Sequence, residues 1–134
     1  MKNEKLIPLL LLNAILLTAC AMPAEEAALT YRQIDAYEAI SMMEKEENYI
    51  ILDVRTQAEF EAAHIPGAIC IPNETISDQP VDRLPDKDQL ILVYCRSGNR
   101  SKQASEKLVK LGYTNIVEFG GISSWPGETV SSAE

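Results

Sequence analysis

The sequence predicts an α/β fold in which a parallel sheet is covered by helices on both faces. Two continuous apolar runs, residues 49–54 and 90–94, are typical of strands that are buried on both faces. The segments around them carry apolar residues at helical spacing, and strands that alternate with helices indicate a parallel sheet. Ligands bind such sheets beyond the carboxyl ends of the strands, so the residues directly after Tyr94 are the first candidates for a site.

The first strand and helix are expected before residue 46. Residues 29–34 form a short candidate strand. Asp35 is a suitable N-cap, and apolar side chains then recur at three-residue spacing from Tyr37 to Met43. This pattern predicts a helix over residues 36–45.

A capping box follows the apolar run at residues 49–54. Thr56 and Glu59 have the required spacing, which predicts a short helix that continues through Ala63. A short strand is expected over residues 68–71, where it is stopped by a proline.

The second half of the chain carries the expected central strand. Residues 73–88 are polar and interrupted by prolines, so at most one turn of helix is expected there. The run at 90–94 is the best candidate for the central strand, and residues 101–111 form an amphipathic helix that Gly112 closes. A last strand is expected over residues 116–119.

The N-terminus has the pattern of an export signal. Lysines precede an apolar stretch from Leu6 to Leu17. A transmembrane helix needs about 20 apolar residues, so this stretch is short for a membrane span and fits the apolar region of a signal peptide. The sequence Leu17-Thr18-Ala19-Cys20 resembles the bacterial lipobox, which implies cleavage before Cys20 and lipidation of its thiol.

Three segments follow from this interpretation. We expect a lipoprotein signal peptide at residues 1–19, a lipidated tether at 20–28 and one folded domain at 29–134. The protein would be exported and anchored by lipid at the extracytoplasmic face of a bacterial membrane, since several acyl chains give stable attachment. An uncleaved membrane anchor and an ordinary secretory signal are the alternatives.

Charge and cysteine content argue against two classes of function. The net charge of −8 argues against a nucleic-acid partner, because duplex binders present a basic face. The three cysteines form no C-x-x-C pair, and with one histidine they do not match the usual spacing of a zinc site. We therefore expect no metal and no cofactor; the sequence indicates no oligomeric state.

The loop after the central strand carries the candidate chemistry. Cys95 ends the strand, and a helix is expected to begin shortly after Arg100. Gly98 with Asn99 permits positive φ, so the backbone amides can curl toward the sulfur and stabilise an anion together with the helix N-terminus. Such a setting lowers a cysteine pKa from about 8.5 into the range of roughly 3.5–7.5. The alternative is that Cys95 is a small buried core residue.

Five short motifs occur in an order that resembles the rhodanese domain. They are Leu52-Asp53-Val54-Arg55, Glu59-Phe60, the stretch from His64 to Ala68, the loop from Cys95 to Arg100, and Gly120-Gly121-Ile122 with Trp125. The resemblance covers Tyr31 to about Gly127. It implies a single rhodanese-like domain with an open parallel five-stranded sheet, helices on both faces, and sulfane-sulfur transfer through a cysteine persulfide.

The resemblance also implies roles for particular residues. Cys95 is the nucleophile, and the substrate-binding cradle consists of Arg96, Ser97, Gly98, Asn99 and Arg100. Asp53 and Arg55 are supporting residues, mainly a buried carboxylate and an arginine that anchors a helix. The partners would be a small anionic sulfur donor such as thiosulfate and a thiol or cyanide acceptor. Two departures are Ala63, where the family often has glycine, and a short segment after Trp125.

Two other functions remain open. Related folds use a cysteine loop for phosphatase or arsenate reductase chemistry, but their loops resemble C-x₅-R, whereas Cys95 to Arg100 is C-x₄-R. A non-catalytic persulfide carrier or binding module is the third possibility.

Three further side chains are expected to be structural. A disulfide between Cys70 and Cys95 is conceivable in an oxidising compartment, but it would consume the nucleophile. We expect Cys70 to be a buried strand residue, and His64 and Trp125 to hold a turn and the core.

Overall fold

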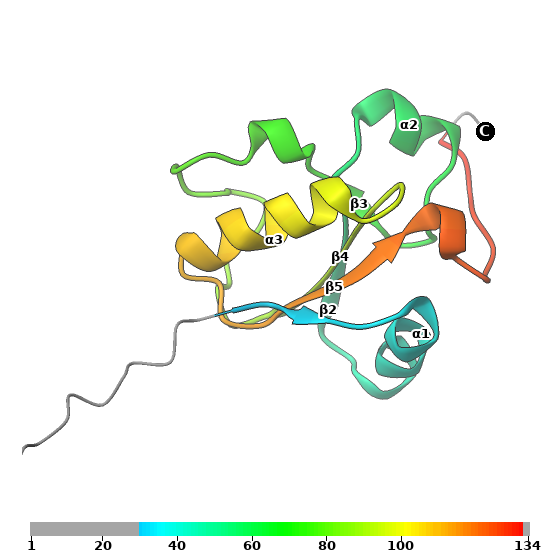
Figure 1. The fold of residues 1–134 in the computed structure, drawn as a ribbon, viewed down its shortest axis with the longest axis horizontal. Coiled ribbons are helices and arrows are strands. Elements are labelled where there is room, and N and C mark those ends of the chain that lie inside the picture. The colour runs from blue at the N-terminus through cyan, green and yellow to red at the C-terminus, as the bar shows by residue number, and fades with distance from the viewer. Residues whose placement is uncertain (1–29, 133–134) are drawn as a thin grey trace, which may run out of the picture.

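The computed structural model describes residues 30–132 and confirms the parallel sheet (Figure 1). All pairings between its named strands are parallel, and the strand order is β1-β5-β4-β2-β3. The central strand is β4, as the sequence predicts. The strands are β1 (Arg32–Gln33), β2 (Tyr49–Asp53), β3 (Ile69–Cys70), β4 (Leu90–Cys95) and β5 (Ile116–Gly121).

Helices cover both faces of this sheet, with α3 on one side and α1 on the other in Figure 1. The predicted helix over residues 36–45 is confirmed, and the Asp35 side chain accepts a hydrogen bond from the Glu38 amide at 2.9 Å. Thr56 and Glu59 form the predicted capping box. The helices are α1 (Ala36–Lys45), α2 (Gln57–Ala62) and α3 (Asn99–Lys110), and two 3₁₀ turns are η1 (Asn73–Thr75) and η2 (Ile122–Ser124).

The largest differences from the sequence prediction are in the boundaries of three elements, whereas other boundaries differ by single residues. The first strand is confined to Arg32–Gln33, because these are the residues that pair with β5 at the edge of the sheet. Helix α3 begins at Asn99 rather than at Ser101, since Gly98 already makes the turn that precedes it. Strand β5 extends to Gly121, which pairs with Cys95 beyond an irregularity in the β4–β5 ladder.

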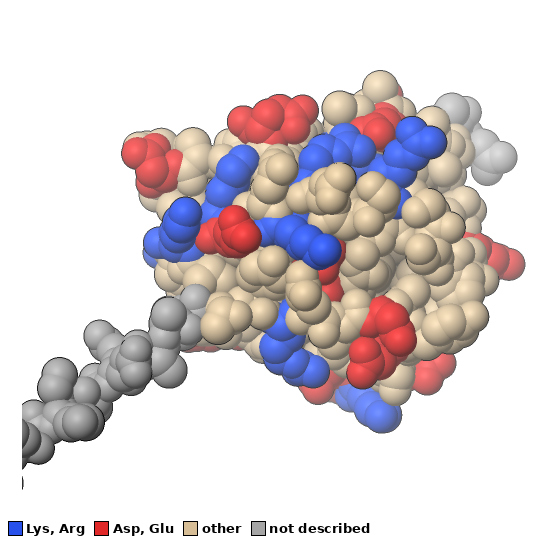
Figure 2. Space-filling model, in the orientation of Figure 1, with Lys and Arg blue, Asp and Glu red and all other residues tan. Residues whose placement is uncertain are grey.

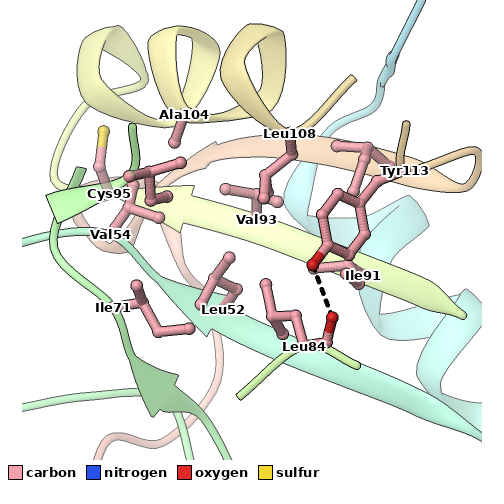
Figure 3. Packing of buried hydrophobic residues seen from close by; sticks show 12 residues of the cluster. Leu52, Val54, Ile71, Leu84, Ile91, Val93, Cys95, Ala104, Leu108 and Tyr113 are labelled. Atoms are coloured by element: carbon pink, nitrogen blue, oxygen red, sulfur yellow. Dashed lines mark hydrogen bonds between the residues drawn. The ribbon is translucent and has the colours of Figure 1, made fainter. Parts of the chain in front are cut away.

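Side chains alternate along β4 between two apolar layers. Ile91, Val93 and Cys95 face α3, whereas Leu92 and Tyr94 face the side covered by α1. Figure 3 shows Cys95 at one end of the α3-side cluster, on the same side of the sheet as Ala104 and Leu108 of α3. The alternation therefore directs the candidate nucleophile toward the beginning of α3.

The predicted signal peptide and the whole predicted tether, including Cys20, lie outside the described residues. Within residues 30–132, no helix is both long enough and apolar enough to cross a membrane. The same residues contain no cluster of three or more His, Cys, Asp or Glu side chains that could hold a metal ion.

Candidate active site

Cys95 lies at the carboxyl end of the central strand, where the rule for parallel sheets places ligands. Cys95 is 1% exposed, so its thiol is buried at the base of the loop that joins β4 to α3. Gly98 has a φ of 110°, which is a conformation that favours glycine, and it turns the chain directly into α3. The loop is consequently short and brings its backbone close to the sulfur.

Hydrogen-bond donors converge on the Cys95 sulfur as the sequence predicts. The Gly98 amide donates to Sγ at 3.0 Å, and the Ser101 hydroxyl oxygen lies 3.4 Å from Sγ. Burial raises the pKa of Cys95, but hydrogen bonds from Ser101 and from the amides of Gly98 and Ser97 outweigh it and lower the pKa. The geometry therefore favours a thiolate in a buried position.

The predicted role of Asn99 in the turn is wrong. Among the described residues, only glycines have positive φ, and Asn99 is the first residue of α3. Gly98 alone supplies the unusual conformation, because a loop that enters the helix at Asn99 needs only one such residue. Arg96, Ser97 and Asn99 have exposed side chains around the mouth of the site.

The two arginines of the loop have different surroundings. Arg100 is bound by Glu59 of α2 through two hydrogen bonds of 2.8 and 3.1 Å. The hydrogen bond with Arg100 is the largest cause that lowers the pKa of Glu59 to about 2. Because Glu59 already neutralises Arg100, the exposed Arg96 is the less compensated cation. Figure 2 shows Lys and Arg side chains on the face that carries α3, interspersed with acidic ones.

Asp53 and Arg55 form a buried ion pair at the end of β2. Arg55 donates to the Asp53 carboxylate at 2.7 Å from its terminal nitrogen and also donates to the Ala63 carbonyl oxygen at 2.6 Å. Asp53 is 0% exposed and Arg55 is 5% exposed. The contacts of Arg55 thus connect the end of β2 to the end of α2.

Two buried polar residues behind Cys95 were not identified from the sequence. Ser101 of α3 is 0% exposed and Glu118 of β5 is 2% exposed. The Ser101 hydroxyl donates to the Glu118 carboxylate at 2.6 Å. An acidic residue between Val117 and Phe119 in an otherwise apolar strand is the sequence signal that points to this buried group.

Cys70 is separated from the site by a strand. In the sheet, β2 lies between β3 and β4, so Cys70 and Cys95 are not on neighbouring strands. Two strand spacings amount to about 9.5 Å, more than a disulfide can bridge without backbone movement. Burial is the largest cause that raises the pKa of Cys70 to about 11.

His64 and Trp125 have structural contacts. The His64 ring stacks on Phe60, and its Nδ1 lies 2.7 Å from the Phe60 carbonyl oxygen. The Trp125 ring packs against Phe119 on the α1 side of the sheet. These contacts therefore contribute to the packing of the scaffold.

Comparisons with known proteins agree with this arrangement. The rhodanese-like domain family matches residues 35–128. The thiosulfate sulfurtransferase PspE of Escherichia coli is 37% identical over 71 residues, which cover 53% of this chain and 68% of PspE. The thiosulfate sulfurtransferase GlpE of Pseudomonas entomophila is 32% identical over 104 residues, which cover 74% of this chain and 92% of GlpE.

Structural similarity extends to a solved rhodanese-like domain of the Alr3790 protein from Anabaena. Its TM-score is 0.66 at 31% identity, with 76% of this chain and 80% of that domain covered. Some relatives are much longer, and this chain spans 22% of the length of two of them.

Proposed function

This chain belongs to the rhodanese-like family, and we propose that it transfers a sulfane sulfur from thiosulfate, or a similar small anionic donor, to a thiol or cyanide acceptor through a Cys95 persulfide. The family match and the names of its relatives support sulfurtransferase activity in general. The observation that carries the finer proposal is the Cys95 sulfur at the end of the central strand, with amides converging on it.

The proposed reaction has two steps on one sulfur atom. The Cys95 thiolate attacks the outer sulfur of thiosulfate, a new S–S bond forms at Sγ, and the original S–S bond breaks as its electron pair leaves with sulfite. An acceptor nucleophile then attacks the outer sulfur of the persulfide, and the electron pair of that S–S bond returns to Cys95 as a thiolate.

The loop supports both steps by favouring negative charge. Amides at the start of α3 stabilise the thiolate that enters the first step and leaves in the second. The exposed Arg96 lies where it can attract an anionic donor, and Ser97 and Asn99 offer polar side chains at the same mouth. Arg100 would contribute less than Arg96, since Glu59 holds its guanidinium.

We further propose that the protein is an exported lipoprotein attached to a bacterial membrane through Cys20. The support is the sequence alone: a short apolar stretch followed by Leu17-Thr18-Ala19-Cys20. The acyl chains would place the domain at the membrane surface, on a short tether that ends before residue 29.

The deciding experiment combines turnover with mass spectrometry of the full chain. Thiocyanate production from thiosulfate and cyanide should be measured beside hydrolysis of an aryl phosphate, for wild type, Cys95→Ser and Cys70→Ser. We expect thiocyanate only, with activity abolished in the Cys95 variant and largely retained in the Cys70 variant.

Thiosulfate treatment should add one sulfur to the peptide that contains Cys95, and cyanide should remove it. Phosphate-ester hydrolysis that depends on Cys95, without sulfur transfer, would contradict the proposal. Addition of the sulfur to Cys70 instead would contradict the assignment of the nucleophile.

A further inference from the structure

Glu118 is a buried carboxylate that the proposed reaction does not use. It lies on β5 with its side chain on the α3 side of the sheet, and the residue is 2% exposed. Neither of the two ion pairs within residues 30–132 involves Glu118. Its Oε1 accepts hydrogen bonds from the Ser101 hydroxyl at 2.6 Å and from the Gly120 amide at 2.9 Å. A buried carboxylate with this arrangement needs an explanation, because burial without a paired cation is unfavourable.

Ser101 connects this carboxylate to the nucleophile. Its hydroxyl oxygen lies 2.6 Å from Glu118 Oε1 and 3.4 Å from Cys95 Sγ. The carbonyl oxygens of Gly98 and Gly120 are also close, at 2.9 and 3.3 Å. Four acceptors therefore surround a hydroxyl that has a single hydrogen.

The distances indicate which acceptor receives that hydrogen. A separation of 2.6 Å between Ser101 and Glu118 is in the range of a charge-assisted O–H···O⁻ bond, which is about twice as strong as a neutral one. The Ser101 hydrogen then points toward Glu118, and Cys95 faces the hydroxyl oxygen. The sulfur can donate to that oxygen as a thiol, whereas a Cys95 thiolate has to compete with Glu118 for the single hydroxyl hydrogen of Ser101.

We propose that Glu118 is a positioning residue for Cys95 that acts through Ser101, by holding the one hydroxyl hydrogen that the thiolate would otherwise receive. This inference rests on the proposed role of Cys95 as the nucleophile. The loop amides still support the thiolate, but Glu118 keeps it from being stabilised further. A more basic thiolate is intrinsically the better nucleophile, so the carboxylate maintains the reactivity of the sulfur once it is ionised.

The other ionisable groups near Cys95 or Glu118 do not position the thiolate in place of Glu118. Arg96 is exposed, and Arg100 is bound by Glu59. Tyr31 precedes β1 and interacts electrostatically with Glu118 and with Glu106 of α3. Burial is the largest cause that raises the pKa of Tyr31, and the two carboxylates raise it further. The Tyr31 hydroxyl therefore stays neutral near pH 7. Glu106 itself is exposed on α3.

Alkylation of Cys95 by iodoacetamide across pH tests the proposal without requiring sulfur transfer. The rate is followed on the Cys95 peptide by mass spectrometry in the full chain, for wild type, Glu118→Gln, Ser101→Ala and the double variant. Glu106→Gln is the matched control, since it removes a carboxylate of α3 that no hydrogen bond links to Ser101. Thermal unfolding verifies that each variant is folded.

We expect Glu118→Gln to move the inflection in the pH dependence of the Cys95 alkylation rate to lower pH. The plateau rate above the inflection should fall by about threefold for each pH unit of that shift, because thiolate nucleophilicity falls with basicity. Ser101→Ala alone should move the inflection much less, and in its background Glu118→Gln should have a smaller effect. Glu106→Gln should leave the profile unchanged.

Three results would overturn the proposal. The first is an unchanged or raised inflection in Glu118→Gln. The second is a shift of equal size with and without the Ser101 hydroxyl, which would mean that the carboxylate acts only by its charge through space. The third is a large upward shift of the inflection in Ser101→Ala alone, because the wild-type hydroxyl would then donate its hydrogen to the sulfur. This last result would overturn the proposal even if the Glu118 variant does not fold.

Discussion

Gly121 of β5 lies so close to the backbone of Arg96 that no side chain fits between them. A β-carbon on Gly121 would overlap the Arg96 carbonyl group and lie 2.5 Å from the Ser97 amide nitrogen. The φ of Gly121 is −144°, which any residue adopts, so glycine is required here for the close approach. The end of β5 therefore forms the support on which the Cys95 loop rests.

Replacement of Gly121 by alanine should displace the loop and impair sulfur transfer. A misplacement of about 1 Å in a catalytic group can reduce the rate by about 100-fold, and we expect a loss of that order in thiosulfate-to-cyanide transfer. The matched control is Gly67→Ala, where an added β-carbon meets no atom within 4 Å but the φ is +83°. That variant should lose about 1–2 kcal/mol of stability through backbone strain and keep its activity. Full activity in the Gly121 variant would contradict the proposed support.

The buried pair of Asp53 and Arg55 should be important for stability. Asp53→Asn leaves the Arg55 cation buried without its carboxylate, and breaking a buried pair in this way costs about 3–5 kcal/mol. Urea unfolding of wild type and variant gives the difference. A loss below about 1 kcal/mol, the level of an exposed pair, would show that water reaches this arginine.

Membrane attachment should depend on Cys20. In a bacterial host, Cys20→Ala should abolish labelling by a radioactive fatty acid and block maturation of the precursor, because the acyl chains need that thiol. Cys70→Ser is the matched control and should be labelled normally, since Cys70 is buried within the domain. Absence of label from the wild type would refute the lipoprotein proposal.

Local sequence patterns predicted most of the helices and strands, because helix caps and apolar spacing act within a short stretch of the chain. Helix α1 begins and ends where its N-cap and apolar spacing indicate, and Asp35 completes the capping box with Glu38. The length of β1 was not predictable in the same way. It depends on how far the chain follows Val117 and Glu118 of β5, which is a tertiary relationship.

The site shows the same division between local and distant causes. The position of Cys95 and the turn at Gly98 follow from the strand and loop pattern. The partner of Arg100 is Glu59, which lies 41 residues earlier, so the loop sequence alone could not reveal this ion pair. The pairing of Ser101 with Glu118 likewise joins two elements through the fold.

The ion pair of Glu59 and Arg100 should make stability depend on pH in the acidic range. The hydrogen bond with Arg100 is the largest cause that lowers the pKa of Glu59 from 4.5 to about 2. A carboxylate with a lowered pKa stabilises the folded state above its ordinary pKa, and this contribution is lost as the pH falls toward 2. Glu59→Gln removes the charge but retains a side chain suited to the capping box with Thr56.

We therefore expect wild type to exceed Glu59→Gln in free energy of unfolding by about 1 kcal/mol at pH 7, in keeping with a partly exposed pair. The difference should diminish between about pH 4.5 and 2 and decrease when salt is added at pH 7. Urea unfolding at pH 7, 5, 4, 3 and 2 measures it, with Glu61→Gln on the same helix as control. A difference that persists unchanged to pH 2 would mean that Glu59 acts through the helix cap instead of through its charge.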